Sequence, residues 1–259
     1  MPNLIHLSDL HFGPCFVPHL GQVILKEIAN LNPDAVIISG DFTYRGRFAE
    51  YAAAREFVGQ IVRPLLVIPG NHDQPLYSVF ERLTTPYARY CQYICDTVDA
   101  SLAIDGLFAL GLNDCHPILP GGFWSRQQRA WIEEQLFRAP RDAVRLVATH
   151  HQFIWGGKWR PAGFWYPTRA LDWLAARGVD LVLNGHTHIP TASQLGSGLV
   201  VVRAGTATSD RVRHGCGNSY NFIAVDSNQI SVFVRQYDAQ ADAYLAAKAY
   251  TFPRRKNPN

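Results

Sequence analysis

The sequence has few charges and few cysteines, and it lacks any long apolar run. Charged residues make up only 17% of the 259 residues, and the formal net charge of +3 is small for this length. The basic stripe that marks nucleic-acid-binding proteins is absent, which argues against nucleic acid as a partner. No apolar run approaches the ~20 residues that a membrane-spanning helix needs. With 47% hydrophobic residues, the chain has enough apolar material for a sizeable core, and we expect a soluble, folded protein.

The five cysteines are odd in number and scattered along the chain. This pattern is typical of free thiols in a reducing compartment. Met1 and Pro2 lead directly into an apolar run, without the charged and apolar regions of a signal peptide. We therefore expect a cytoplasmic protein.

Short apolar runs alternate with helical patterns through the first two thirds of the chain. The apolar runs predict five buried strands, at 4–7, 35–38, 65–68, 146–148 and 181–183. Amphipathic or alanine-rich stretches predict a helix from residue 20 that ends near Asn32-Pro33, and helices at 47–61, 125–137 and 168–177. A less regular helical region is predicted at 76–93. A hairpin is predicted over 101–112, turning at Asp105-Gly106.

From Leu199 onward the pattern changes to strands, predicted at 199–203, 222–226 and 230–237. The alanine-rich run 244–252 fits a strand or a helix. We predict an α/β fold, a four-layer αββα sandwich of two mixed β-sheets flanked by helices. One domain would span residues 1–253, followed by a short basic tail over 254–259.

One polar run follows each of the five predicted buried strands. The runs are Asp9-Leu10-His11, Gly40-Asp41, Gly70-Asn71-His72-Asp73, His150-His151 and Gly185-His186-Thr187-His188. Because ligands of open α/β sheets bind beyond the carboxyl ends of the strands, we expect these runs to meet at one edge. They offer oxygen and nitrogen ligands without thiolates, in about the number that two adjacent divalent ions need.

The spacing inside the runs favours shared metal ligation. Asp9 and His11 lie two residues apart, as do His186 and His188, so each pair can point its side chains the same way from extended backbone. The Asp41 carboxylate has two oxygens and can bridge two cations. Each run alone is equally typical of a turn or a helix cap. Five of them in this order, each after a strand, predict a metal site.

These runs, within residues 4–188, resemble the calcineurin-like metallophosphoesterases. The later segment Asn218-Ser219-Tyr220-Asn221-Phe222 is similar to the tail of the class III cyclic-nucleotide phosphodiesterase branch. The resemblance implies a bridging role for Asp41 between two metal ions. It implies that one ion is held by Asp9, His11 and His188, and the other by Asn71, His150 and His186. It also implies that His72 lies beside the reacting phosphate, held or polarised by Asp73.

One departure from the family pattern concerns the ligand in the His150-His151 pair. Relatives commonly have a proline soon after these histidines, whereas this chain has Gln152-Phe153. His150 is the ligand that the resemblance favours, and His151 remains the alternative.

The resemblance implies a hydrolase that cleaves a P–O bond in a small phosphoester, with a phosphodiester favoured. Two divalent ions ~3.5–4 Å apart can share a bridging hydroxide that attacks phosphorus in line, while His72 would stabilise the transition state or protonate the leaving oxygen. Manganese, iron, zinc and cobalt all suit such ligands. The candidate substrates are cyclic nucleotides, nucleotide-linked pyrophosphates, glycerophosphodiesters and nucleic-acid ends.

Two alternatives remain open from the sequence alone. The chain could be a phosphomonoesterase or nucleotide pyrophosphatase of the same fold, or a catalytically silent scaffold that binds a partner. The complete ligand set argues against the scaffold, which would gain nothing from keeping His72.

An aromatic segment, residues 153–166, follows the His150 run. It predicts a specificity loop, whose rings stack on a base or cover an acyl group while Lys158 or Arg160 meets a phosphate. The alternatives are a loop buried by its own aromatic rings and a subunit interface, which leaves a homodimer open. Arg45 is either a phosphate contact or an exposed arginine at a helix start. His116 is either a pocket residue or a structural loop histidine.

Overall fold

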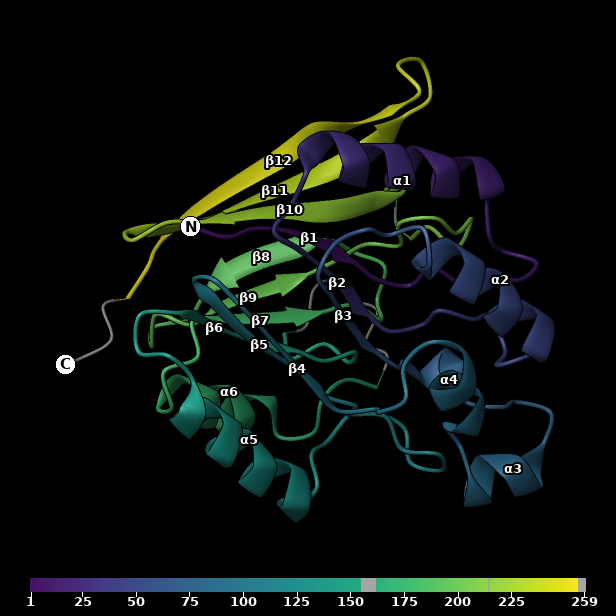
Figure 1. Cartoon of the computed structure of the whole chain (residues 1–259), viewed down its shortest axis with the longest axis horizontal. Coiled ribbons are helices and arrows are strands. Elements are labelled where there is room, and N and C mark those ends of the chain that lie inside the picture. The colour runs from purple at the N-terminus through teal and green to yellow at the C-terminus, as the bar shows by residue number, and fades with distance from the viewer. Residues whose placement is uncertain (155–161, 214, 256–259) are drawn as a thin grey trace.

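Two six-stranded mixed sheets pack against each other in residues 1–154, 162–213 and 215–255, the parts of the chain that the computed structural model describes. Figure 1 shows the sheets between two groups of helices, with α1 and α2 on one side and α5 and α6 on the other. The predicted αββα sandwich is confirmed.

The first sheet combines three strands from the first half of the chain with three from its end. Its order is β12-β11-β10-β1-β2-β3. The parallel strands are β1 (Asn3–Leu7), β2 (Ala35–Ser39) and β3 (Leu65–Ile68). The antiparallel strands are β10 (Ser219–Val225), β11 (Gln229–Asp238) and β12 (Ala243–Pro253).

The second sheet has a parallel centre and antiparallel edges, in the order β4-β5-β6-β7-β9-β8. The parallel strands are β5 (Leu107–Gly111), β6 (Val144–Ala148), β7 (Leu181–Asn184) and β9 (Val200–Arg203). The edge strands are β4 (Ala100–Ile104) and β8 (Thr191–Gln194).

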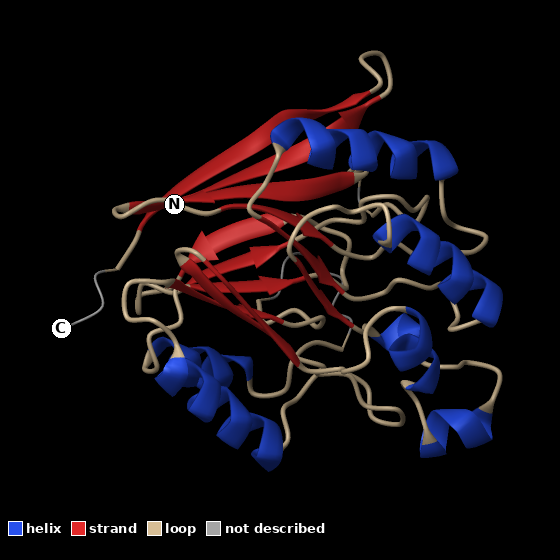
Figure 2. Cartoon of the chain, in the orientation of Figure 1, coloured by secondary structure: helices blue, strands red, loops and turns tan. Residues whose placement is uncertain are grey.

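Helices cover the two outer faces (Figure 2). On the first sheet lie α1 (Pro18–Leu31), α2 (Phe48–Val58) and α4 (Ala88–Tyr93), and on the second lie α5 (Arg126–Arg138) and α6 (Pro167–Ala175). The short α3 (Val79–Thr84) buries none of its residues. A single 3-10 turn, Asn71–Asp73, follows β3.

The four layers enclose three apolar cores, and alternate residues of a strand go to different cores. Ile5 and Leu7 of β1 pack beneath the helices, whereas Leu4 lies between the two sheets. This is the two-residue alternation of side chains along a strand. The sheets are therefore buried on both faces, which explains the unbroken apolar runs of β2 and β7 in the sequence.

The structure differs from the predicted elements in two places and selects one of the two alternatives at a third. The helical region 76–93 is two short helices, α3 and α4, because Pro86 disfavours helix at Thr85, whose φ and ψ are −142° and 57°. The edge strand β8 was not predicted, since Thr191–Gln194 carries no apolar pattern. The ambiguous run 244–252 is a strand, within β12.

None of the described helices is long and apolar enough to cross a membrane. The division of the chain at residue 253 stays a prediction, and residues 256–259 of the predicted tail lie outside the described residues.

Candidate metal centre

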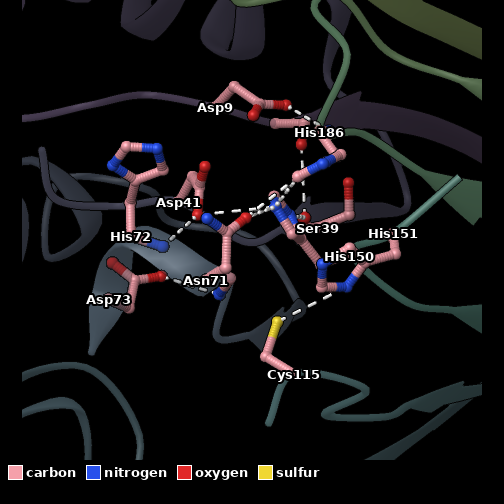
Figure 3. A network of polar contacts seen from close by, with 12 residues as sticks. Asp9, Ser39, Asp41, Asn71, His72, Asp73, Cys115, His150, His151 and His186 are labelled. Atoms are coloured by element: carbon pink, nitrogen blue, oxygen red, sulfur yellow. Dashed lines mark hydrogen bonds and ion pairs between the residues drawn. The ribbon is translucent and has the colours of Figure 1, made fainter. Parts of the chain in front are cut away.

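The predicted ligand runs meet where the carboxyl ends of β1, β2 and β3 face those of β6 and β7 (Figure 3). Of the described non-glycine residues, eight have positive φ, and five of these are predicted ligands. They are Asp9, His11, Asp41, His186 and His188, with φ between 54° and 71°. Backbone in this unfavourable region clusters at functional sites, where the surrounding structure enforces it. The extended backbone predicted for the pairs Asp9/His11 and His186/His188 is therefore wrong, because all four residues adopt left-handed backbone.

Two glycines, Gly70 and Gly185, allow the strand ends to approach closely. A Cβ at Gly70 would lie 2.2 Å from Asp41 Oδ1, and one at Gly185 would lie 1.8 Å from Ser8 Oγ and 2.5 Å from Asp9 Oδ2. No larger side chain fits at either position without moving a carboxylate of the site.

The first cage of ligand atoms consists of Asp9, His11, His188 and one oxygen of Asp41. His188 Nε2 lies 3.1 Å from Asp9 Oδ1 and 3.1 Å from His11 Nε2. Asp41 Oδ2 lies 3.8 Å from His11 Nε2. Ligands about 2.0–2.2 Å from one ion are separated from one another by roughly these distances.

The second cage consists of Asn71, His150, His186 and the other oxygen of Asp41. Asn71 Oδ1 lies 3.0 Å from His150 Nε2 and 2.9 Å from His186 Nδ1. Asp41 Oδ1 lies 3.4 Å from His150 Nε2. The Asp41 carboxylate therefore faces both cages.

The hydrogen bonds around the first cage leave its ligand atoms free to bind a cation. His11 Nδ1 donates to the Thr43 carbonyl at 3.3 Å and His188 Nδ1 donates to the Arg211 carbonyl at 2.6 Å. In the neutral rings both Nε2 atoms then carry lone pairs, which face each other. Asp9 Oδ1 is buried and has no hydrogen-bond partner. The residues present thus fit a metal ion, and the carbonyls orient its ligands as in known metal sites.

The buried charges also favour cations. Burial lowers the pKa of His11 to about 3, despite the Asp41 carboxylate, so the ring is neutral and able to ligate. Burial would lower the pKa of His150 too, but Asp41, Asp9 and Asp114 raise it to about 9. Carboxylates that attract a proton this strongly also attract a metal ion, which displaces the proton on binding.

His150, not His151, enters the cage. The His151 ring packs against the His186 ring, with centroids 4.6 Å apart, while its Nδ1 lies 3.3 Å from Asp114 Oδ1 and 3.7 Å from Cys115 Sγ. The Asp114 carboxylate also accepts the backbone N–H groups of His150 and His151, at 3.3 and 2.9 Å. Asp114 therefore holds the turn that carries His150 in place through these hydrogen bonds. The sequence held no signal for this role.

His72 lies beside the first cage, its ring 5.0 Å from that of His11. The structure gives it a different partner from the predicted Asp73, because His72 Nδ1 donates to the Tyr44 carbonyl at 2.7 Å. The Asp73 carboxylate instead accepts the backbone N–H groups of Gly70 and Thr43, both at 2.8 Å, and of Phe42 at 3.2 Å. Asp73 thus joins the turns that carry Asp41 and Asn71.

Arg211 is a site residue that the sequence reasoning missed. Its Nη1 lies 3.3 Å from His72 Nε2 and 3.4 Å from His11 Nε2. It stands in a loop after β9 with no distinguishing pattern, so only the fold brings it to the centre. Arg45 also lies near, with Nη2 donating to the Tyr44 hydroxyl at 2.9 Å.

The structure tests the prediction for His116 and part of the prediction for the aromatic segment 153–166. His116 Nδ1 accepts the backbone N–H groups of Ile118 and Leu119, which is the structural alternative. Of the aromatic segment, residues 155–161 with Lys158 and Arg160 lie outside the described residues. Phe153 and Phe164 are buried in the core between the second sheet and its helices.

The two-sheet sandwich and its paired cages define a class of proteins with a dinuclear metal centre at the strand ends. The chain belongs to the calcineurin-like phosphoesterase family, whose model matches residues 2–190. The resemblance noted in the sequence is therefore confirmed.

Named relatives fit this family. The chain is 32% identical over 166 residues to the glycerophosphodiester phosphodiesterase GpdQ of Enterobacter lignolyticus, an alignment that covers 57% of this chain and 56% of that protein. It is 27% identical over 197 residues to a probable cyclic nucleotide phosphodiesterase of Synechococcus, with 72% and 73% coverage. The structure superposes on a purple acid phosphatase of yellow lupin with a TM-score of 0.72 at 12% identity, covering 98% of this chain and 54% of that one, which supports the fold alone.

Proposed function

We propose that this chain is a dinuclear metal-dependent phosphodiesterase. Asp9, His11 and His188 would hold one ion, Asn71, His150 and His186 the other, and Asp41 would bridge them. The observation that carries the proposal is the position of Asp41, with Oδ2 3.8 Å from His11 Nε2 and Oδ1 3.4 Å from His150 Nε2. A scaffold without chemistry has no need of a carboxylate that faces two cages.

When bound, two such ions lower the pKa of water and neutralise charge on the phosphoryl oxygens. The chain itself supplies two further groups. The hydrogen bond to the Tyr44 carbonyl orients the His72 ring, so that Nε2 is the nitrogen available to the substrate. Arg211 lies beside that nitrogen and adds a fixed positive charge where negative charge develops on the phosphoryl group.

A diester substrate is supported by the names of the relatives. One is named a glycerophosphodiester phosphodiesterase and another a probable cyclic nucleotide phosphodiesterase. The first alignment spans little more than half of that protein, 56%, so the substrate is assigned here by class only.

A paired metal and activity assay tests this function. The protein loaded with manganese should bind two ions per chain. It should hydrolyse bis(4-nitrophenyl) phosphate faster than 4-nitrophenyl phosphate. Chelation with EDTA should abolish both the metal binding and the hydrolysis. Bound metal without hydrolysis of either compound would favour the scaffold. Faster hydrolysis of the monoester would favour a phosphomonoesterase.

Three finer assignments accompany the proposal. Manganese, iron, zinc or cobalt would fill the centre, since its ligands are nitrogen and oxygen. The cytoplasm is the proposed compartment, supported by five cysteines that are all free thiols. The homodimer stays a prediction that light scattering in solution would test.

A further inference from the structure

A small cavity of about 120 Å³ opens beside His72 and Asn71. Tyr44, Gln74 and Leu76 form neutral parts of its wall, and Arg45 and Arg82 supply two positive charges. None of its described lining residues carries a carboxylate. The cavity is therefore polar, cationic and continuous with the proposed site.

Neither arginine of the cavity forms an ion pair with any described residue. Arg45 donates through Nη2 to the Tyr44 hydroxyl at 2.9 Å, while its buried Nε has no partner. Arg82 donates through Nε to the Pro117 carbonyl at 2.7 Å, which fixes the guanidinium, and its terminal nitrogens form no hydrogen bond with a described residue. Arg89, by contrast, forms an ion pair with Glu81.

Tyr44 connects this cavity to the reacting centre. Its carbonyl accepts from His72, and its ring lies 4.5 Å from the Arg45 guanidinium and 5.5 Å from that of Arg211. Three arginines therefore surround the side of the centre on which His72 stands. Unpaired guanidinium groups held close together repel one another unless an anion binds between them.

We propose that this cavity binds an anionic group carried by the leaving side of the phosphodiester, in addition to the phosphate that reacts. The inference rests on the proposed function and adds to it that His72 acts at the leaving oxygen. A leaving group next to His72 would extend toward Arg45 and Arg82. Guanidinium groups recognise carboxylate and phosphate by paired N–H donors, and the cavity has room for one such group.

The proposal distinguishes between substrate types. A leaving group that is a neutral alcohol would leave both arginines without a partner. One that bears a carboxylate or a phosphate would satisfy them. The natural substrate is therefore a diester with a second negative charge on the departing half.

Three synthetic diesters that share one scaffold test this inference. They are ethyl phenyl phosphates with a carbamoyl, a carboxylate or a phosphonate group at the 4-position of the phenyl ring. The manganese-loaded protein should hydrolyse the charged compounds with a higher kcat/KM than the neutral carbamoyl compound. The carboxylate and phosphonate arms separate the two kinds of anion.

The variants Arg45→Gln and Arg82→Gln should each reduce the ratio of kcat/KM for the charged and neutral compounds by roughly 10- to 100-fold, the value of a hydrogen bond to a charged group. Arg55→Gln, on the exposed face of α2, is the matched control and should keep the parent ratio. Thermal unfolding checks that the variants are folded.

A parent protein without preference for the charged compounds would overturn the inference, as would variants that keep the parent ratio. In either case hydrolysis of the neutral compound would leave the proposed function standing. Hydrolysis of none of the three by the metal-loaded parent would overturn both.

Discussion

Asp41 has a role that no other side chain of the site can take, because its two oxygens face different cages. The remaining proposed ligands each belong to one cage. Asp41 is buried, and its Oδ1 also accepts the backbone N–H of His72 at 2.9 Å. A single residue would therefore contact both proposed ions, and it also holds the turn that carries His72.

Replacing Asp41 with alanine should remove metal and activity together. Even partners outside the ligand shell change metal affinity or activity by roughly 10–100-fold, so loss of the bridge should reduce activity by more than about 100-fold. Metal content per chain and hydrolysis of bis(4-nitrophenyl) phosphate would be measured on the same sample. Two ions retained at parent affinity would contradict the bridging role.

His72→Ala should behave differently, because His72 lies outside the cages. The variant should keep both ions and lose rate by roughly 10²–10⁴-fold, the usual value of a general acid. His19→Ala, at an exposed histidine of α1, is the control and should match the parent. Unchanged turnover in His72→Ala would reject a catalytic role for this residue.

At the scale of secondary-structure elements, the position of the proposed ligands depends more on the turns after the strands than on the strands themselves. The strands of the parallel segments could be predicted because both faces are buried, which gives continuous apolar runs. The ligand runs could be predicted because each directly follows such a strand. Gly70 and Gly185 lie in these turns, at positions where a Cβ would collide with Asp41 or Asp9.

Other features of the site could not be predicted because no local pattern encodes them. Arg211 and Asp114 reach the centre from loops whose course depends on the packing of both sheets. The partner of His72 is a backbone carbonyl, that of Tyr44, and backbone carbonyls have no sequence signature. Asp73 sits next to His72 in the chain, yet its carboxylate turns to backbone donors of another turn.

Gly70→Ala tests how tightly the turn after β3 is built. The added Cβ would lie 2.2 Å from Asp41 Oδ1 and 2.4 Å from the Asp41 backbone nitrogen, so the bridging carboxylate must move. We expect weaker metal binding and a destabilisation of about 1–3 kcal/mol, typical of overpacking. Gly196→Ala, where a Cβ meets nothing within 4 Å, is the control. Equal metal affinity in the two variants would show that the turn is more tolerant than the structure indicates.

For the whole molecule, a buried histidine between strands links folding to pH. His6 on β1 contacts Ser39 Oγ at 2.8 Å, and burial lowers the pKa of His6 to about 3. The unfolded chain, where this pKa is near 6.5, therefore binds one more proton between about pH 6.5 and 3. The stability linked to His6 is present above pH 6.5 and is lost as the pH falls toward 3.

The variant His6→Gln should remove the group that binds this extra proton in the unfolded chain. Its free energy of unfolding should fall less steeply below pH 6.5 than that of the parent, by up to about 1.4 kcal/mol per pH unit. Urea unfolding of the metal-free proteins at several pH values would measure both slopes. Parallel curves would mean that His6 takes up its proton equally in the folded state.

Anomalous X-ray diffraction from crystals soaked in manganese tests the central claim most directly. It should give two peaks ~3.5–4 Å apart, one among Asp9, His11 and His188 and one among Asn71, His150 and His186, with Asp41 between them. A single peak, or peaks away from Asp41, would contradict a dinuclear centre in this chain.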